Sequence, residues 1–189
     1  MKSHPFLRHA WLAAALALLV GCAGQPLNPP PPKFSALPET DTRMQRLTFH
    51  HQDQRHELIG VLRHDERSLR LALLSPQGQR LLTLVHDDHG ARFLANTAFD
   101  PPFSAEWLAS RMAWSLWPSP ALVQAFAASD WSLVEDREDR TIRYRNRAIA
   151  RITGSAKCRI IDDFEGDYRL YIAPLDDDTD RIAATCPAD

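Results

Sequence analysis

A β-hairpin is predicted by one segment near the middle of the chain, Leu69-Arg70-Leu71-Ala72-Leu73-Leu74-Ser75-Pro76-Gln77-Gly78-Gln79-Arg80-Leu81. Leucine occupies every second position from Leu69 to Leu73, which is the pattern of a strand with one buried and one exposed face. Pro76 and Gly78 then supply the residues typical of a tight turn. Because a tight turn joins antiparallel neighbours, this segment predicts an antiparallel meander.

Short segments with strand character recur at intervals of about 8 to 12 residues on both sides of this hairpin. The predicted strands are Arg43–His50, His56–Arg63, Ser68–Leu74, Arg80–His86, Ala91–Ala95, Trp131–Glu135, Arg140–Arg145, Ala148–Thr153, Cys158–Asp162 and Tyr168–Ala173. The sequence shows neither an internal repeat nor an alternation of strands with helices, so a parallel sheet is not expected.

Two helices are predicted between the fifth and sixth strands. The first begins with Ser104 as N-cap and ends near Trp117, because Pro118 follows. The second begins at Ser119-Pro120, with proline in the first turn. We therefore expect a mainly β (α+β) fold, a curved antiparallel half-barrel of about ten strands whose concave face is covered by two central helices.

The N-terminus predicts export. Lys2 and Arg8 precede an apolar run at residues 10–20, which is shorter than the about 20 residues that a bilayer core requires but suits a signal peptide. The run ends in Leu19-Val20-Gly21-Cys22, which resembles the lipobox of bacterial lipoproteins.

The lipobox resemblance implies cleavage before Cys22 and attachment of a diacylglycerol and a fatty acyl chain, such as palmitate, to that cysteine. Two or three acyl chains anchor a protein stably to a membrane. Ala23 follows Cys22 in place of the Asp associated with retention in the inner membrane. The resemblance therefore favours the outer membrane, with the protein facing the periplasm.

The expected organisation is a signal peptide at residues 1–21, a lipidated cysteine with a Pro-rich tether at 22–38, and one domain at 39–189. Consecutive prolines at Pro29–Pro32 favour an extended spacer. The full sequence has a net charge of −2, and removal of the signal peptide, with Lys2 and Arg8 and no acidic residue, leaves −4. This charge gives no argument for nucleic acid as a partner.

Cys158 and Cys186 remain once Cys22 carries lipid. An even pair of cysteines in an oxidising compartment predicts a disulfide, which would hold the C-terminal segment against a strand. Two buried free thiols or a metal pair is the alternative interpretation.

The first predicted helix is apolar over most of its circumference, so it is either buried or lines an apolar cavity. Core packing and contact with a ligand as a lid are both consistent with this pattern. The residues expected to line a hydrophobic hollow are Trp107, Leu108, Met112, Trp114, Leu116, Trp117 and Phe126.

Two polar clusters in the sequence are candidate binding sites. His86 and His89 flank two aspartates, but a hairpin turn explains this segment, and no metal is expected. Six arginines lie within fifteen residues, and a solvated strand face or a contact surface for phosphate headgroups would account for them; they are Arg137, Arg140, Arg143, Arg145, Arg147 and Arg151. The sequence contains no recognisable catalytic motif, so neither an enzyme nor a cofactor is expected.

The lipobox, the hairpin at residues 69–81, the central helices and the segment Gly166–Ile172 together resemble a family of uncharacterised bacterial lipoproteins. That family is similar to the LolA/LolB lipoprotein carriers, which implies an open half-barrel with a hollow that accepts acyl chains. Members of the family are often encoded beside enzymes of fatty-acid-like polyene biosynthesis. One departure is the turn at Pro76–Gly78, where LolB-type receptors carry an exposed apolar residue and this chain offers Gln77.

The expected function is therefore an outer-membrane lipoprotein that binds or transfers an acyl- or polyene-type lipid in the periplasm. Its expected partners are the membrane, through the lipid anchor, a hydrophobic small molecule or lipid, and a periplasmic carrier protein. The alternative is a structural or assembly lipoprotein that docks a protein partner and holds no ligand.

Overall fold

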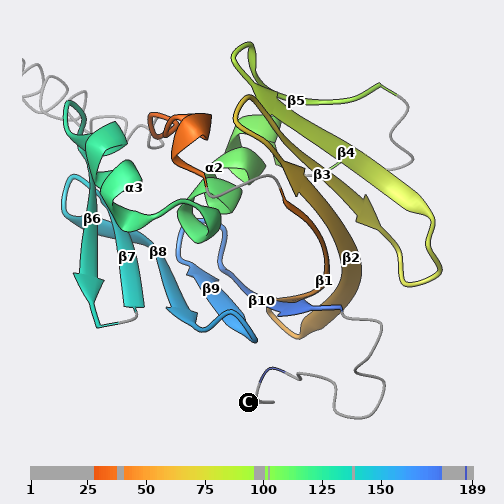
Figure 1. The fold of residues 1–189 in the computed structure, drawn as a ribbon. Coiled ribbons are helices and arrows are strands. Elements are labelled where there is room, and N and C mark those ends of the chain that lie inside the picture. The colour runs from red at the N-terminus through yellow and green to blue at the C-terminus, as the bar shows by residue number, and fades with distance from the viewer. Residues whose placement is uncertain are drawn as a thin grey trace, which may run out of the picture.

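The computed structural model describes residues 28–37, 41–95, 101, 103–137, 139–175 and 186. Within them, ten strands form one antiparallel sheet, and two α-helices lie between the fifth and sixth strands (Figure 1). The elements are η1 (Phe34–Ala36), β1 (Asp41–His51), β2 (Gln54–His64), β3 (Leu69–Leu74), β4 (Arg80–Asp87), β5 (Gly90–Phe93), α2 (Ala105–Leu116), α3 (Ser119–Phe126), β6 (Trp131–Asp136), β7 (Asp139–Tyr144), β8 (Arg147–Gly154), β9 (Arg159–Asp163) and β10 (Tyr168–Pro174). The expected strands and helices are confirmed in type and order, with ends that differ by a few residues.

The predicted hairpin is formed by β3 and β4. Along β3 the leucines at alternate positions are buried, and Leu71 pairs with Leu84 of β4. The turn is closed by the backbone N–H of Ser75, which donates to the carbonyl of Gln79 at 2.8 Å. Gly78 has a φ of +82°, a conformation that favours glycine.

The sheet consists of two meanders joined by their first and last strands. Its order is β5-β4-β3-β2-β1-β10-β9-β8-β7-β6, so β1 pairs with β10, for example Leu47 with Ile172. The edge strands β5 and β6 are not paired with each other, and the sheet curves around α2 and α3 without closing (Figure 1). The half-barrel architecture is therefore confirmed.

The hydrophobic core lies between the concave face of the sheet and the helices. Every second side chain of the strands points into it, as Leu62, Leu84 and Ile142 do, each with an exposed fraction of 0%. These residues pack against Trp114 of α2 and Leu122 of α3 in one continuous cluster. Within the described part of the chain, no helix is long and apolar enough to cross a bilayer.

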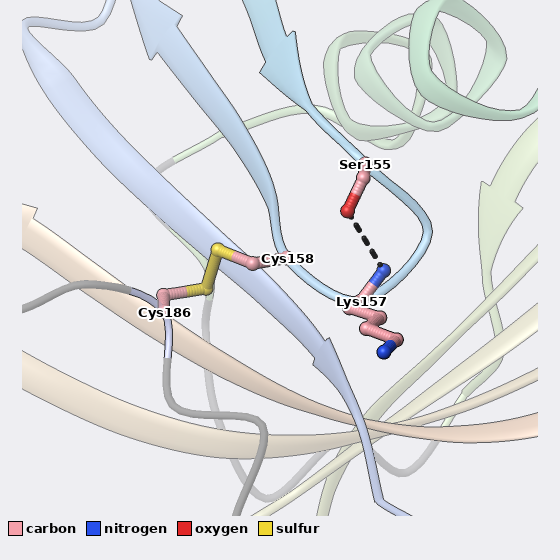
Figure 2. The surroundings of a disulfide bond; sticks show 4 residues. All are labelled: Ser155, Lys157, Cys158 and Cys186. Atoms are coloured by element: carbon pink, nitrogen blue, oxygen red, sulfur yellow. Dashed lines mark hydrogen bonds between the residues drawn. A yellow bond between two sulfur atoms is a disulfide. The ribbon is translucent and has the colours of Figure 1, made fainter.

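The predicted disulfide joins Cys158, directly before β9, to Cys186 (Figure 2). The loop that leads into β9 is held by the Ser155 hydroxyl, which accepts from the Lys157 N–H at 3.3 Å, and by the Cys158 carbonyl, which accepts from the Ser155 N–H at 2.9 Å. The predictions for the signal peptide and Cys22 lie outside the described residues.

Candidate functional site

Helix α2 begins and ends where its sequence signals predict. The Ser104 hydroxyl accepts a hydrogen bond from the backbone N–H of Trp107 at 3.1 Å, which is an N-cap contact. The helix ends at Leu116, before Pro118. These local signals set the ends of α2, which lies within the curve of the sheet (Figure 1).

The seven residues predicted to line a hollow lie on α2 and α3 or directly after α2, and they belong to the hydrophobic core or pack against it. Trp114 and Trp117 are each 1% exposed, and Trp107 and Leu116 are partly buried. Trp131 of β6 bridges the two helices, because its ring lies 5.9 Å from Trp114 and 6.3 Å from Phe126. The structure thus shows these side chains packed together, and their contact with a ligand stays a prediction.

A buried arginine, which the sequence analysis did not single out, lies on the same helix. Arg111 is 3% exposed, and its guanidinium carbon lies 4.3 Å from the centre of the Trp107 ring and 4.5 Å from that of Trp114. Its Nε donates to Asp163 and its Nη2 to Glu165, both at 2.6 Å. The sequence does carry a signal for these contacts, because Trp107 and Trp114 lie four residues before and three residues after Arg111 and so share its face of the helix.

Asp163 organises the turn between β9 and β10 as well as the ion pair. Its Oδ1 accepts from the backbone N–H groups of Glu165 and Gly166, at 3.0 and 2.6 Å. Its Oδ2 accepts from the Tyr168 hydroxyl at 3.3 Å. Burial and the Asp163 charge raise the pKa of Tyr168 well above its usual range. Burial by itself would lower the pKa of Arg111, but the Asp163 hydrogen bond and charge outweigh it and raise that pKa.

The C-terminal end of α2 is held by arginines from two strands. Arg140 of β7 donates from Nη1 to the carbonyl of Trp117 at 2.8 Å, and Arg159 of β9 donates from Nη1 to the carbonyl of Ser115. These carbonyls lack partners within the helix, and cations there also interact favourably with the helix dipole. Together with Arg111, these contacts fix α2 to the sheet along its length.

A third part of the cover comes from the segment at residues 28–37, which we call the arm. Phe34 and Leu37, which the sequence analysis placed in the spacer, are each 9% exposed and belong to the hydrophobic core. The Lys33 carbonyl accepts from Nε1 of Trp117 at 2.9 Å. The spacer therefore contributes side chains to the domain.

The arm packs against a buried histidine of the sheet as well as against Trp117. The Phe34 ring lies edge-on to His86 of β4 at 5.0 Å and to Trp117 at 5.7 Å. Burial lowers the pKa of His86, although the charges of Asp87 and Glu106 oppose this shift. The imidazole of His86 is thus part of the surface on which the arm lies, and its burial disfavours the charged form.

The two polar clusters of the sequence, the turn at residues 86–89 and the arginine-rich segment at 137–151, do not each gather into one binding site among the described residues. Both carboxylate oxygens of Asp87 bind Arg92, at 2.8 and 2.6 Å, and its Oδ1 also accepts from the His89 N–H. Among the residues that the structure describes, no three His, Cys, Asp or Glu side chains are grouped to hold a metal ion. In the arginine-rich segment, Arg145 and Arg151 pair with exposed carboxylates, whereas Arg140 turns toward α2.

A small polar pocket lies on the exposed side of the β2–β3 hairpin. It is lined by Arg63, Asp65, Ser68 and Arg70. Asp65 is occupied by the turn itself, because its Oδ1 accepts from the N–H groups of Arg67 and Ser68, each at 2.8 Å. The pocket is therefore explained by turn geometry.

Comparison with known proteins gives one family match. The model of the family described as Protein of unknown function (DUF3261) matches residues 42–176, which extend from the start of β1 past the end of β10. No curated protein matches the chain.

Proposed function

The chain belongs to the family described as Protein of unknown function (DUF3261), and from its geometry we propose that it binds an apolar acyl- or polyene-type molecule. The chain would be lipidated on Cys22 and anchored to the outer membrane, facing the periplasm. The disulfide supports export, since disulfides persist in oxidising compartments. Its role would be binding or transfer, without catalysis.

The observation that carries the proposal is the apolar concave face of an open sheet, covered by helices and by a short arm. A second sheet or a closed barrel would bury such a face permanently, whereas a local cover can be displaced. The side chains of the cover are aromatic or flexible and apolar, as Trp117, Phe34 and Met112 are. Such side chains suit acyl and polyene surfaces, because contact with them is non-directional.

The arm is the part of this cover whose displacement would break the fewest hydrogen bonds and ion pairs. Helix α2 is held by the ion pair of its own Arg111 with Asp163 and by hydrogen bonds from Arg140 and Arg159, so its displacement would break a buried ion pair. Among the described residues, the arm is held by one hydrogen bond from Trp117 and by the burial of Phe34 and Leu37. We therefore place the moving element in the arm and not in α2, for which core packing and a ligand-contacting lid were both consistent with the sequence.

Cargo would bind by replacing the arm. Each Å² of apolar surface removed from water contributes about 25 cal/mol, so an acyl chain can compensate for the apolar contacts that Phe34 and Leu37 lose. The cargo then shifts the population toward the arm-released state. Because the arm directly follows the expected anchor, release would take place close to the membrane.

The test is a titration of the mature chain, carrying Cys22→Ser, with a naturally fluorescent polyene fatty acid. We expect saturable binding of about one ligand per chain, with energy transfer from the core tryptophans to the polyene. Absence of saturable binding would contradict the proposal and favour the alternative, a lipoprotein that docks a protein partner with its core permanently filled.

A further inference from the structure

Two guanidinium groups from different strands lie at the same end of α2. Arg140 comes from β7 and Arg159 from β9, and β8 separates these strands in the sheet. Their hydrogen bonds go to the carbonyls of Trp117 and Ser115, which lie within two residues of each other. Both arginines are half-buried at the edge of the hydrophobic core.

Positive charge exceeds negative charge at this place. Glu135 lies 3.5 Å from Nε of Arg140, and its carboxylate also accepts from the Ser119 hydroxyl. Arg159 has no carboxylate within ion-pair distance among the described residues. Burial lowers the pKa of Arg159, and so do the positive charges of Arg140 and Arg43.

The helix alone does not balance this charge. The C-terminus of a helix carries about half a negative unit charge, whereas Arg140 and Arg159 carry two positive charges against the single carboxylate of Glu135. Among the described residues, Glu135 is thus the single carboxylate set against these two cations. A partly desolvated cation without a counter-charge is costly, which favours binding of an anion.

Each guanidinium also keeps donors for such an anion. An arginine has five N–H donors in a planar fork, and the bonds to the helix use one nitrogen, Nη1, of each. The remaining N–H groups of the Arg159 guanidinium can donate in pairs to two oxygens of a carboxylate or a phosphate.

Trp117 connects this cationic end to the arm. Its carbonyl accepts from Arg140, while its indole N–H donates to Lys33 and its ring packs against Phe34. Departure of the arm would therefore open an apolar space beside the arginines. A chain in that space could carry its head group at Arg140 and Arg159.

We infer that Arg140 and Arg159 bind the anionic head, a carboxylate or a phosphate, of a molecule whose apolar chain takes the place of Phe34. This inference rests on the proposed function and narrows it to amphiphiles with one negatively charged end. Of the arginine-rich segment in the sequence, Arg140 alone contributes to this site, and Arg159 lies outside that segment.

The experiment compares three ligands with the same twelve-carbon chain, namely dodecanoate, dodecyl phosphate and dodecanol, by displacement of the fluorescent polyene from the Cys22→Ser chain. We expect at least one of the two anions to bind about tenfold more tightly than the alcohol, or better. Arg159→Gln should remove most of this preference while the alcohol keeps its affinity, and Arg159→Lys should restore part of it.

Arg151→Gln is the matched control, because it removes the same charge from the exposed face of neighbouring β8 and should leave the preference unchanged. Equal affinities for all three ligands would overturn the inference while leaving the proposed function intact. Binding of inorganic phosphate as tight as that of dodecyl phosphate would also overturn it, since the site would then serve a free anion. Absence of binding by any chain would remove the proposed function as well. If Arg159→Gln does not fold, the preference of the unchanged chain still decides the question.

Discussion

Arg111 and Asp163 form an ion pair inside the core, although 52 residues separate them in the sequence. Nε of Arg111 lies 2.6 Å from Oδ2 of Asp163, and the two side chains are 4% and 0% exposed. The pair connects the helix that covers the concave face to the turn between β9 and β10. It is the reason why we assign the movable part of the cover to the arm and not to α2.

Replacing Arg111 with Met should destabilise the protein by about 3–5 kcal/mol, because it leaves the buried carboxylate of Asp163 without its counter-charge. The measurement is the free energy of unfolding in urea. The control is Arg151→Met, which breaks an exposed pair with Asp139 and should cost less than about 1 kcal/mol. Equal losses for the two variants would show that the Arg111 pair does not fasten the helix.

Loss of the disulfide should lower stability by about 3–4 kcal/mol, since the bond between Cys158 and Cys186 closes a loop with a sequence separation of 28. Denaturation with and without a reducing agent measures the effect. The double variant Cys158→Ser/Cys186→Ser should match the reduced protein and should not respond to the reductant. An unchanged midpoint on reduction would contradict the stabilising role of the bond.

Truncation of Phe34 to Ala should loosen the arm and make cargo binding tighter. A core Phe→Ala change typically lowers the free energy of unfolding by about 3–5 kcal/mol. The loss for Phe34→Ala should not exceed this, because the arm can detach locally. Polyene affinity and urea unfolding are the two readouts. The matched control is Phe164→Ala in the β9–β10 turn, where the phenylalanine is 55% exposed, and both quantities should stay near the wild-type values. If Phe34→Ala weakens binding, then Phe34 belongs to the binding site and does not compete with the cargo.

Acidification should destabilise the protein through His86. Burial lowers the pKa of this histidine below its ordinary 6.5, so the unfolded chain takes up a proton at a higher pH than the folded chain does. The contribution of His86 is therefore fully present above pH 6.5 and is lost as the pH falls through the folded-state pKa. Urea midpoints measured from pH 7 to pH 5 should fall less steeply in His86→Phe than in the wild type. Parallel curves would show that His86 does not contribute to the acid sensitivity.

Local signals explain why the strands, helices and turns could be predicted. Leucine at alternate positions of β3, the Ser104 N-cap and Gly78 in its turn each act within a few residues of themselves. The disulfide could be predicted by counting cysteines in a chain that is expected to be exported. None of these inferences needed the position of a distant segment.

The remaining features depend on contacts between distant segments. The pairing of β1 with β10 and the ion pair of Arg111 with Asp163 each join residues whose proximity has no local signature. The prolines around Phe34 indicated an extended spacer, and the burial of Phe34 depends on Trp117 and His86, which lie far along the chain. For the same reason, the sequence showed a run of arginines but not that Arg140 and Arg159 lie at one helix end.

The central claim, that the concave face accepts an apolar molecule, is tested most directly by native mass spectrometry with lipid extraction. The sample is the chain from residue 23 onward, which lacks the proposed lipidation site, produced in the periplasm of the native host. We predict a bound acyl- or polyene-type lipid that is lost in Trp114→Glu when that variant remains folded. A ligand-free mass, together with no uptake of added fatty acids or polyenes, would contradict the claim.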